Sequence, residues 1–158
     1  MGRKNQKWNI GDIFTVQLND GTFVVGQVIG REAKVLNSVT VAFYDLRFDS
    51  EEEVLNLESL ASEDIFSTVF ATRESLDSGT WHIVGQCPVV VPENMMPYED
   101  LRSAGFVGAI VRGSGILDEF LNAYYALMPW DDWKDPDYLD QLLISKDKKP
   151  QNLVYKNN

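Results

Sequence analysis

Hydrophobic and polar residues alternate near the start of the chain, which is the period of a strand with one buried face. Phe14, Val16 and Leu18 are each separated by one polar residue. Residues 22–29 are almost continuously apolar, so a strand here has both faces covered. Between them stands Asn19-Asp20-Gly21, and Asp-Gly is the strongest short hairpin signal, because a type I′ turn needs positive φ at both central residues. The pattern predicts two strands joined by a tight turn.

Later segments rich in β-branched and aromatic residues predict four further strands, at residues 35–48, 64–72, 81–85 and 106–112. The stretch 88–92 has proline at both ends, which predicts an edge or connecting strand rather than a central one. The acidic run 49–53 predicts a loop, and residues 74–79 predict a turn. Pro97 is the first position of a brief helix predicted over residues 97–101.

The last third of the chain changes to a helical period. Apolar residues recur every three or four positions over residues 116–127, which predicts an amphipathic helix with Ser114 as its N-cap. Pro129 ends this helix. A second helix is predicted over residues 135–143, where an Asp-Pro pair supplies the cap and the first position.

These elements together predict an α+β fold. The strands form a small, strongly twisted antiparallel β-sheet or an SH3-like half-barrel, and the two helices form a C-terminal annex. The chain has 158 residues, enough to build the core of one domain. We expect a single domain over residues 1–158, with residues 1–9 and 146–158 as loose ends.

The net charge of the chain limits the kinds of partner that it can bind. The formal net charge is −10, which argues against nucleic acid and anionic membranes as ligands. The acids concentrate in two stretches, residues 45–64 and 118–140. Each stretch is either a solvated acidic surface or a docking face for a basic partner. The apolar runs are too short to span a bilayer, and a lone cysteine, Cys87, fits a reducing compartment, so we expect a cytoplasmic protein.

A search for chemistry finds no catalytic site, metal site or cofactor site. His82 and Cys87 are the chain's one histidine and one cysteine, which is too few for a Cys/His zinc cluster and favours a surface histidine and a small buried thiol. The acidic stretch 131–137 lacks the glycine and the final glutamate of an EF-hand loop. The loop 112–115 matches neither the P-loop nor the dinucleotide-binding pattern. We predict that the protein is not an enzyme.

Aromatic residues among carboxylates are more informative. Trp130 and Trp133 flank two aspartates, a combination that suits an interface offering buried anchors and negative charge. The alternative is that these tryptophans pack the helical annex onto the sheet.

Fragments in order along most of residues 8–143 resemble an immunity-protein family of bacterial polymorphic toxin systems. They are Trp8-x-x-Gly11-Asp12-Ile13-Phe14, Leu18-x-Asp20-Gly21-x-Phe23, Gly26-Gln27-Val28, Val41-Ala42-Phe43-Tyr44-Asp45, Gly79-Thr80-Trp81-His82-Ile83-Val84-Gly85 on to Pro88, Glu119-Phe120-Leu121-Asn122-Ala123-Tyr124 and Pro129-Trp130-Asp131-Asp132-Trp133-x-Asp135-Pro136-x-Tyr138-Leu139-x-x-Leu142-Leu143. One departure is Gln27, where the family is associated with a basic residue; this leaves open whether position 27 belongs to a binding site.

The resemblance implies a small cytoplasmic protein, encoded beside a toxin, that inactivates this toxin by tight binding without catalysis. It implies no catalytic residue and no cofactor. Many such toxins are nucleases, whose sites attract phosphate, and a carboxylate-rich face can occupy such a site. Two sets of contact residues follow as a hypothesis: Asp131, Asp132, Asp135, Trp130 and Trp133, or else Glu51, Glu52 and Glu53.

Two alternatives stay open. The chain can be a generic interaction or regulatory domain that binds a small molecule in an aromatic cleft, for which a deep apolar pocket would be the sign. It can also be an enzyme with an acid pair held in a cleft.

Overall fold

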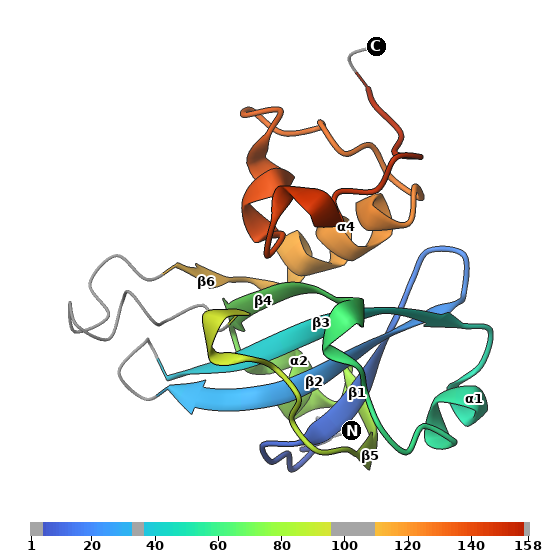
Figure 1. Ribbon diagram of the computed structural model, residues 1–158, viewed down its shortest axis with the longest axis vertical. Helices are drawn as coiled ribbons and strands as arrows, with labels where there is room; N and C mark the ends of the chain where they lie inside the picture. Colours follow the sequence, from blue (N-terminus) through green and yellow to red (C-terminus); the bar gives the residue numbers. More distant parts are fainter. Residues whose placement is uncertain (1–4, 33–36, 96–109, 157–158) are drawn as a thin grey trace.

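A computed structural model describes residues 5–32, 37–95 and 110–156, and these ranges contain a six-stranded sheet of order β5-β1-β2-β3-β4-β6 (Figure 1). The strands are β1 (Asp12–Gln17), β2 (Phe23–Glu32), β3 (Ser38–Phe48), β4 (Ile65–Ala71), β5 (His82–Gln86) and β6 (Val111–Arg112). Neighbouring strands are antiparallel except β4 and β6, which are parallel. The helix predicted over 97–101 and the first residues of the strand predicted over 106–112 lie outside the described ranges.

Short helical segments surround this sheet. They are α1 (Glu51–Leu55), α2 (Glu74–Ser78), α4 (Ser114–Tyr124) and the 3-10 segments η1 (Ser62–Asp64), η2 (Glu93–Met95), η3 (Tyr138–Leu142) and η4 (Lys146–Lys148). In Figure 1, α4 and the C-terminal residues form a layer above the sheet, and α2 lies behind it. A segment that we call the strap, residues 88–92, crosses the front of the sheet between β5 and η2.

Both faces of the sheet are covered, as the apolar run of the second strand predicts. Val24 and Val28 of β2 belong to a core cluster that includes the apolar residues of α4. Val25 and Ile29 belong to a second cluster on the other face, which includes Val54 of α1. The alternation of side chains along a strand sends successive residues into the two clusters.

The predicted hairpin is confirmed, but the predicted type I′ turn is wrong. The amide of Gly21 donates to the carbonyl of Leu18 at 2.9 Å, and the amide of Leu18 donates to the carbonyl of Thr22 at 2.8 Å. Gly21 has φ of +88°, whereas Asp20 is not among the residues with positive φ. The loop therefore has three residues and needs the left-handed conformation at the glycine alone. Hydrogen bonds from Thr22, with Arg47 alongside, hold the pKa of the Asp20 carboxyl below its usual value.

The α+β class is confirmed, but the half-barrel and the two-helix annex are not. The sheet is open, because β5 and β6 occupy opposite ends of the strand order. The second predicted helix is the five-residue 3-10 segment η3. Its start explains the difference: the amide of Asp137 donates to the Asp135 carboxylate at 2.9 Å, and the amide of Tyr138 donates to the Asp135 carbonyl at 3.0 Å. These short-range bonds favour a turn over an α-helix.

Four local predictions also need correction. Residues 51–53 are not a loop but the first turn of α1, where the Glu53 carboxylate accepts the Asp49 backbone amide at 3.0 Å and its charge favours the positive end of the helix. Residues 74–79 contain α2 rather than a turn alone. Ser114 is the first residue of α4 and not its N-cap, and its hydroxyl donates to Glu74 at 2.9 Å. The strap forms no strand and is a connection.

The described parts of the chain ends, which we expected to be loose, are held by hydrogen bonds. The Gln6 amide nitrogen donates to the carbonyls of Leu76 at 2.9 Å and Trp81 at 2.8 Å. The Lys156 amide donates to the Asp131 carboxylate at 2.6 Å. Polar side chains thus attach both ends where the sequence shows no hydrophobic pattern.

Phe14 packs closely over Gly26, which lies opposite it in the β1–β2 ladder. A Cβ on Gly26 would lie 2.6 Å from Cε2 of Phe14. The Phe14 ring cannot withdraw, because it is stacked on Trp81 with the ring centroids 4.9 Å apart and touches Phe43 edge-on. Position 26 therefore has no room for a side chain.

We predict that Gly26→Ala lowers the free energy of unfolding by about 1–3 kcal/mol, because it overpacks a rigid core. Urea denaturation checks this. Gly115→Ala is the matched control: nothing lies within 4 Å of its new Cβ, so it should cause no loss. Equal stability of the Gly26→Ala variant and the parent protein would contradict the packing described.

The end of α4 carries backbone strain at Ala126, whose φ is +62°. The Leu127 amide donates to the Asn122 carbonyl at 2.8 Å, and the Ala126 amide donates to the Ala123 carbonyl at 3.0 Å. This bond pair is the Schellman motif, which usually places glycine at the left-handed position. An alanine there carries a steric cost of about 1–2 kcal/mol.

We predict that Ala126→Gly raises the free energy of unfolding by about 0.5 kcal/mol, since the relieved strain exceeds the entropy that glycine adds to the unfolded chain. Ala123→Gly, in right-handed helix three residues earlier, should instead lower it by about 1 kcal/mol. Thermal denaturation of both variants measures the signs. A loss of stability in Ala126→Gly would show that the helix end is not strained.

Candidate functional site

One of the two predicted contact sets lies on α1, and we call its residues Glu51, Glu52 and Glu53 the α1 carboxylates. Glu51 fixes the helix to the sheet: it accepts the Thr15 hydroxyl at 2.7 Å, and its other oxygen lies 3.1 Å from Nδ1 of His82. Glu52 and Glu53 are exposed, and the Glu52 carboxylate makes no hydrogen bond with the described part of the chain. The set therefore offers negative charge on a helix that is held to β1 and β5.

The other predicted set, which we call the second set, consists of Trp130, Asp131, Asp132, Trp133 and Asp135. Most of its side chains make contacts within the protein. Trp130 has no exposed surface, and its indole donates to Asp140 at 2.7 Å, so it packs the C-terminal layer onto the core. Asp131 is 7% exposed and accepts the Lys156 amide. Asp132 forms an ion pair with the Lys156 ammonium at 3.0 Å.

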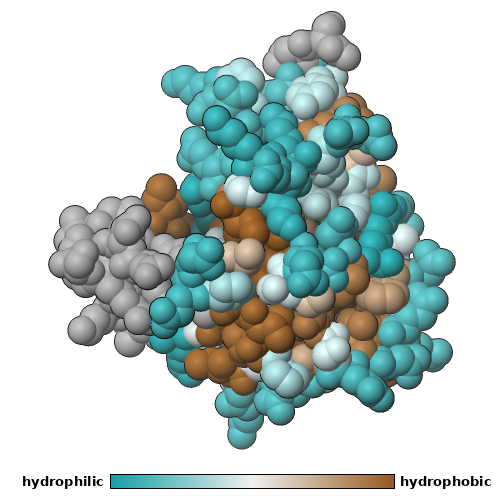
Figure 2. All heavy atoms as spheres, viewed as in Figure 1, coloured by the Kyte–Doolittle hydropathy of each residue, from teal (hydrophilic) through white to brown (hydrophobic). Residues whose placement is uncertain are grey.

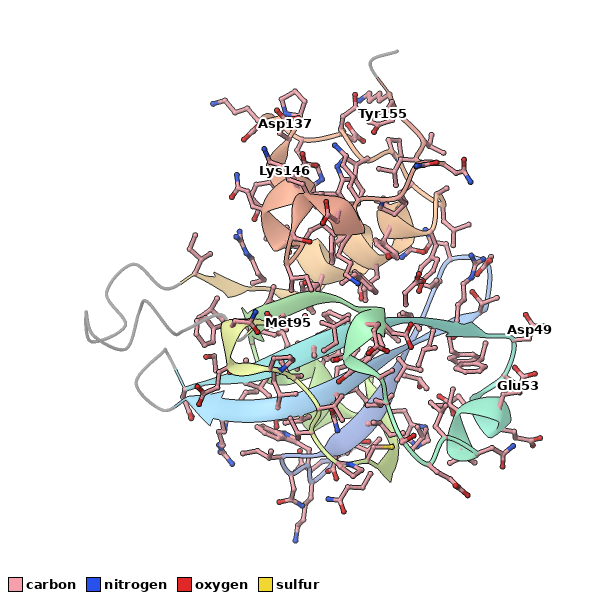
Figure 3. All side chains as sticks on the ribbon, in the orientation of Figure 1. Asp49, Glu53, Met95, Asp137, Lys146 and Tyr155 are labelled. Atoms are coloured by element: carbon pink, nitrogen blue, oxygen red, sulfur yellow. The ribbon has the colours of Figure 1, made fainter. Side chains whose placement is uncertain are left out.

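Three members of the second set keep surface exposure, and Asp132 is exposed despite its ion pair. Asp135 is exposed and accepts a backbone amide from its own turn. Trp133 is partly buried, with its ring centroid 4.8 Å from that of Tyr138. The structure does not bring the two sets together. In Figure 3, Glu53 lies beside one end of the sheet, whereas Asp137, near the second set, lies at the top of the C-terminal layer.

A groove that sequence reasoning missed lies between the end of β3, η1 and the C-terminal residues. It has a volume of about 530 Å³ and is lined by Asp45, Glu63, Asp64, Tyr124, Tyr125, Ala126, Asp147, Lys148, Lys149, Pro150, Gln151 and Asn152. The Tyr125 hydroxyl donates to Asp45 at 2.9 Å, and the Arg47 guanidinium lies 5.0 Å from the Tyr125 ring centre. Burial, and then the Asp45 charge, raise the pKa of Tyr125 well above its usual value.

The charges in this groove are mixed. Burial lowers the pKa of Lys149, but its hydrogen bond to Asp140 and the charge of that carboxylate outweigh burial, so the pKa is raised overall. The Lys148 ammonium donates to the Glu63 carbonyl at 2.6 Å. The groove can bind polar groups. The adjacent residues Tyr124 and Tyr125 can be noticed in the sequence. The residues of other elements that complete the groove cannot.

The histidine and the cysteine do not form a reactive pair. His82 is exposed and opposite Thr15, while Cys87 is buried and its amide bonds the Gly11 carbonyl. Thr15, which lies opposite His82, and Gly11, which accepts the Cys87 amide, are about 13 Å apart along the chain, at about 3.3 Å per residue. Burial raises the pKa of the Cys87 thiol. In the described ranges, no three His, Cys, Asp or Glu side chains gather as metal ligands would.

The loop 112–115 is also used structurally: the Arg112 guanidinium donates to the Tyr138 hydroxyl at 2.6 Å. Gln27, whose role the sequence left open, is fully buried. Its amide nitrogen donates to the carbonyls of Gly11 at 3.2 Å and Cys87 at 2.8 Å, and its oxygen accepts the Tyr44 hydroxyl at 3.1 Å. Position 27 therefore ties the residue before β1 and the residue before the strap to the sheet.

Comparison with known protein families finds one match. The sequence profile of Immunity protein 26 matches residues 9–104, which include β1 to β5, α1 and the strap. The match ends before α4, so it does not cover the fragments of the resemblance at residues 119–143. No curated protein and no solved structure is significantly similar to the chain. No helix in the described ranges is long and apolar enough to cross a membrane. Since the profile covers more than half of the 158 residues, the chain belongs to the Immunity protein 26 family.

Proposed function

We propose that this protein neutralises a cognate bacterial toxin in the cytoplasm by binding it, without catalysis. The family match over residues 9–104 carries the proposal. The net charge of −10 supports a protein partner with a basic surface rather than nucleic acid or a membrane. A toxin that cleaves nucleic acid presents such a surface, because its site attracts phosphate.

The α1 carboxylates are the better of the two predicted contact sets. They lie inside the family match, whereas Asp131, Asp132 and Asp135 lie outside it. Glu52 and Glu53 are exposed, and the Glu51 contacts fix the direction in which α1 presents them. Because the helix that carries them is already held, these carboxylates need less ordering when they bind a cationic site, which lowers the entropy cost of association. Asp132, Asp135 and Trp133 form the second candidate surface.

A second candidate function is supported by the groove beside Tyr125. Its volume of about 530 Å³ is in the range of small-molecule sites. A polar ligand held there would make the protein a ligand-binding regulatory domain. Its lining is charged rather than apolar, which is unusual for such a site, and we rank this function second.

The direct test is protection. We predict that co-expression with the toxin domain encoded next to this gene restores cell survival, and that the two purified chains elute as one complex in gel filtration. Survival without this chain would contradict the proposal, as would the absence of a complex at micromolar concentrations. A small molecule released from the purified protein on denaturation would instead favour the second function.

We predict that Glu52→Gln combined with Glu53→Gln lowers the association rate constant for the toxin domain about tenfold and weakens its dependence on salt, because charge steers the encounter. Surface plasmon resonance at two salt concentrations measures both effects. Asp132→Asn combined with Asp135→Asn removes the same charge from the second surface and serves as the matched control. If only the control variant binds more slowly, the toxin docks on the C-terminal layer.

A further inference from the structure

We infer that the toxin also covers an apolar patch on the front of the sheet, with an acidic rim provided by the α1 carboxylates. This inference rests on the proposed function and names the surface that would perform it. The apolar patch consists of Leu55 and Leu57, in and after α1, Val84 in β5, and the strap residues Val89, Val90 and Val91.

Two residues of the patch are exposed, and the other four join it to the core below. Leu55 is 58% exposed and Val89 is 38% exposed. The other four residues are partly buried and pack against the core cluster on this face. Figure 2 shows hydrophobic residues gathered over the lower half of this face, where the strap crosses the sheet, with hydrophilic residues around them. An exposed apolar area with a polar border is typical of a protein-binding surface.

The residues on either side of the strap are held by the sheet, and the strap itself is open. At one end Gln27 donates to the Cys87 carbonyl at 2.8 Å. At the other end the Thr68 hydroxyl donates to the Met95 carbonyl. Between these points the amides of residues 89–91 make no hydrogen bond with the described part of the chain. Free amides on a fixed segment can pair with an extended segment of a partner.

Charge decides between possible occupants. The exposed carboxylates of Glu52, Glu53 and Glu58 are close in sequence to Leu55 and Leu57 and border them with negative charge. Two copies of this chain docked through the patch would bring these carboxylates together, which opposes self-association. The surface instead fits an apolar protrusion flanked by Lys or Arg, which is how the basic surface of the toxin would meet it.

Two variants with a matched control test this inference. Val89→Thr keeps the shape of the side chain and removes apolar surface, and Leu55→Gln does so on α1. Val154→Thr makes the same change at a valine that is 44% exposed in the C-terminal layer. Combined Val89→Thr and Leu55→Gln should raise the Kd for the purified toxin domain at least tenfold, whereas Val154→Thr should change it less than twofold. Thermal denaturation of each variant confirms that it is folded.

Hydrogen exchange on the unaltered protein provides a second measurement that no folding defect can affect. The amides of residues 89–91 should exchange quickly in the free protein and at least tenfold more slowly in the complex. Amides of residues 151–153, beside the groove, should exchange at the same rate in both states.

The outcomes separate this inference from the proposed function. Protection of residues 151–153 alone, or equal Kd values for the patch variants and Val154→Thr, overturns the inference and leaves the proposed function intact. Failure of the unaltered protein to bind or neutralise the toxin overturns both.

Discussion

Burial of both faces of the β2–β3 pair is the constraint on which the rest of the structure depends. Successive apolar residues of β2 enter opposite core clusters, so the sheet needs a cover on each side. Helix α4 and the C-terminal residues supply one cover; α1, the loop after it and the strap supply the other. The second cover is thin and built from short segments. Its apolar residues therefore reach the surface, next to the carboxylates of α1.

The carboxylates fall into two groups: those that hold the fold together and those that are exposed at the surface. Asp140 and Asp131 accept hydrogen bonds from Trp130 and Lys156 and hold the C-terminal layer together. Glu51 joins α1 to the sheet. Glu52 and Glu53 are left exposed on an element whose position is fixed. The negative charge of the chain thus has a structural part and a part available to a partner, and position in the fold distinguishes them.

Local patterns in the sequence predict the hairpin, most strands and the amphipathic helix, because alternation and helical period depend on neighbours in the chain. They fail where contacts between residues distant in sequence determine the structure. Whether the sheet closes depends on β5 and β6, which are consecutive strands in the chain but lie at opposite edges of the sheet. Helix α1 lies in a charged run that resembles a loop in the sequence. Its hydrogen bonds to Thr15 and His82 join residues distant in sequence, so local patterns do not predict them. The burial of Trp130 and the groove beside Tyr125 likewise come from contacts across elements.

The central claim is neutralisation by binding alone, and stoichiometric titration of the toxin's activity tests it most directly. With the toxin domain held well above the Kd, its activity should fall linearly and reach zero at one equivalent of this protein. The mass of the toxin should be unchanged, and its activity should return once the two chains are separated. Complete inactivation by a small fraction of an equivalent, or a lasting change in the mass of the toxin, would contradict the claim and identify this protein as a catalyst.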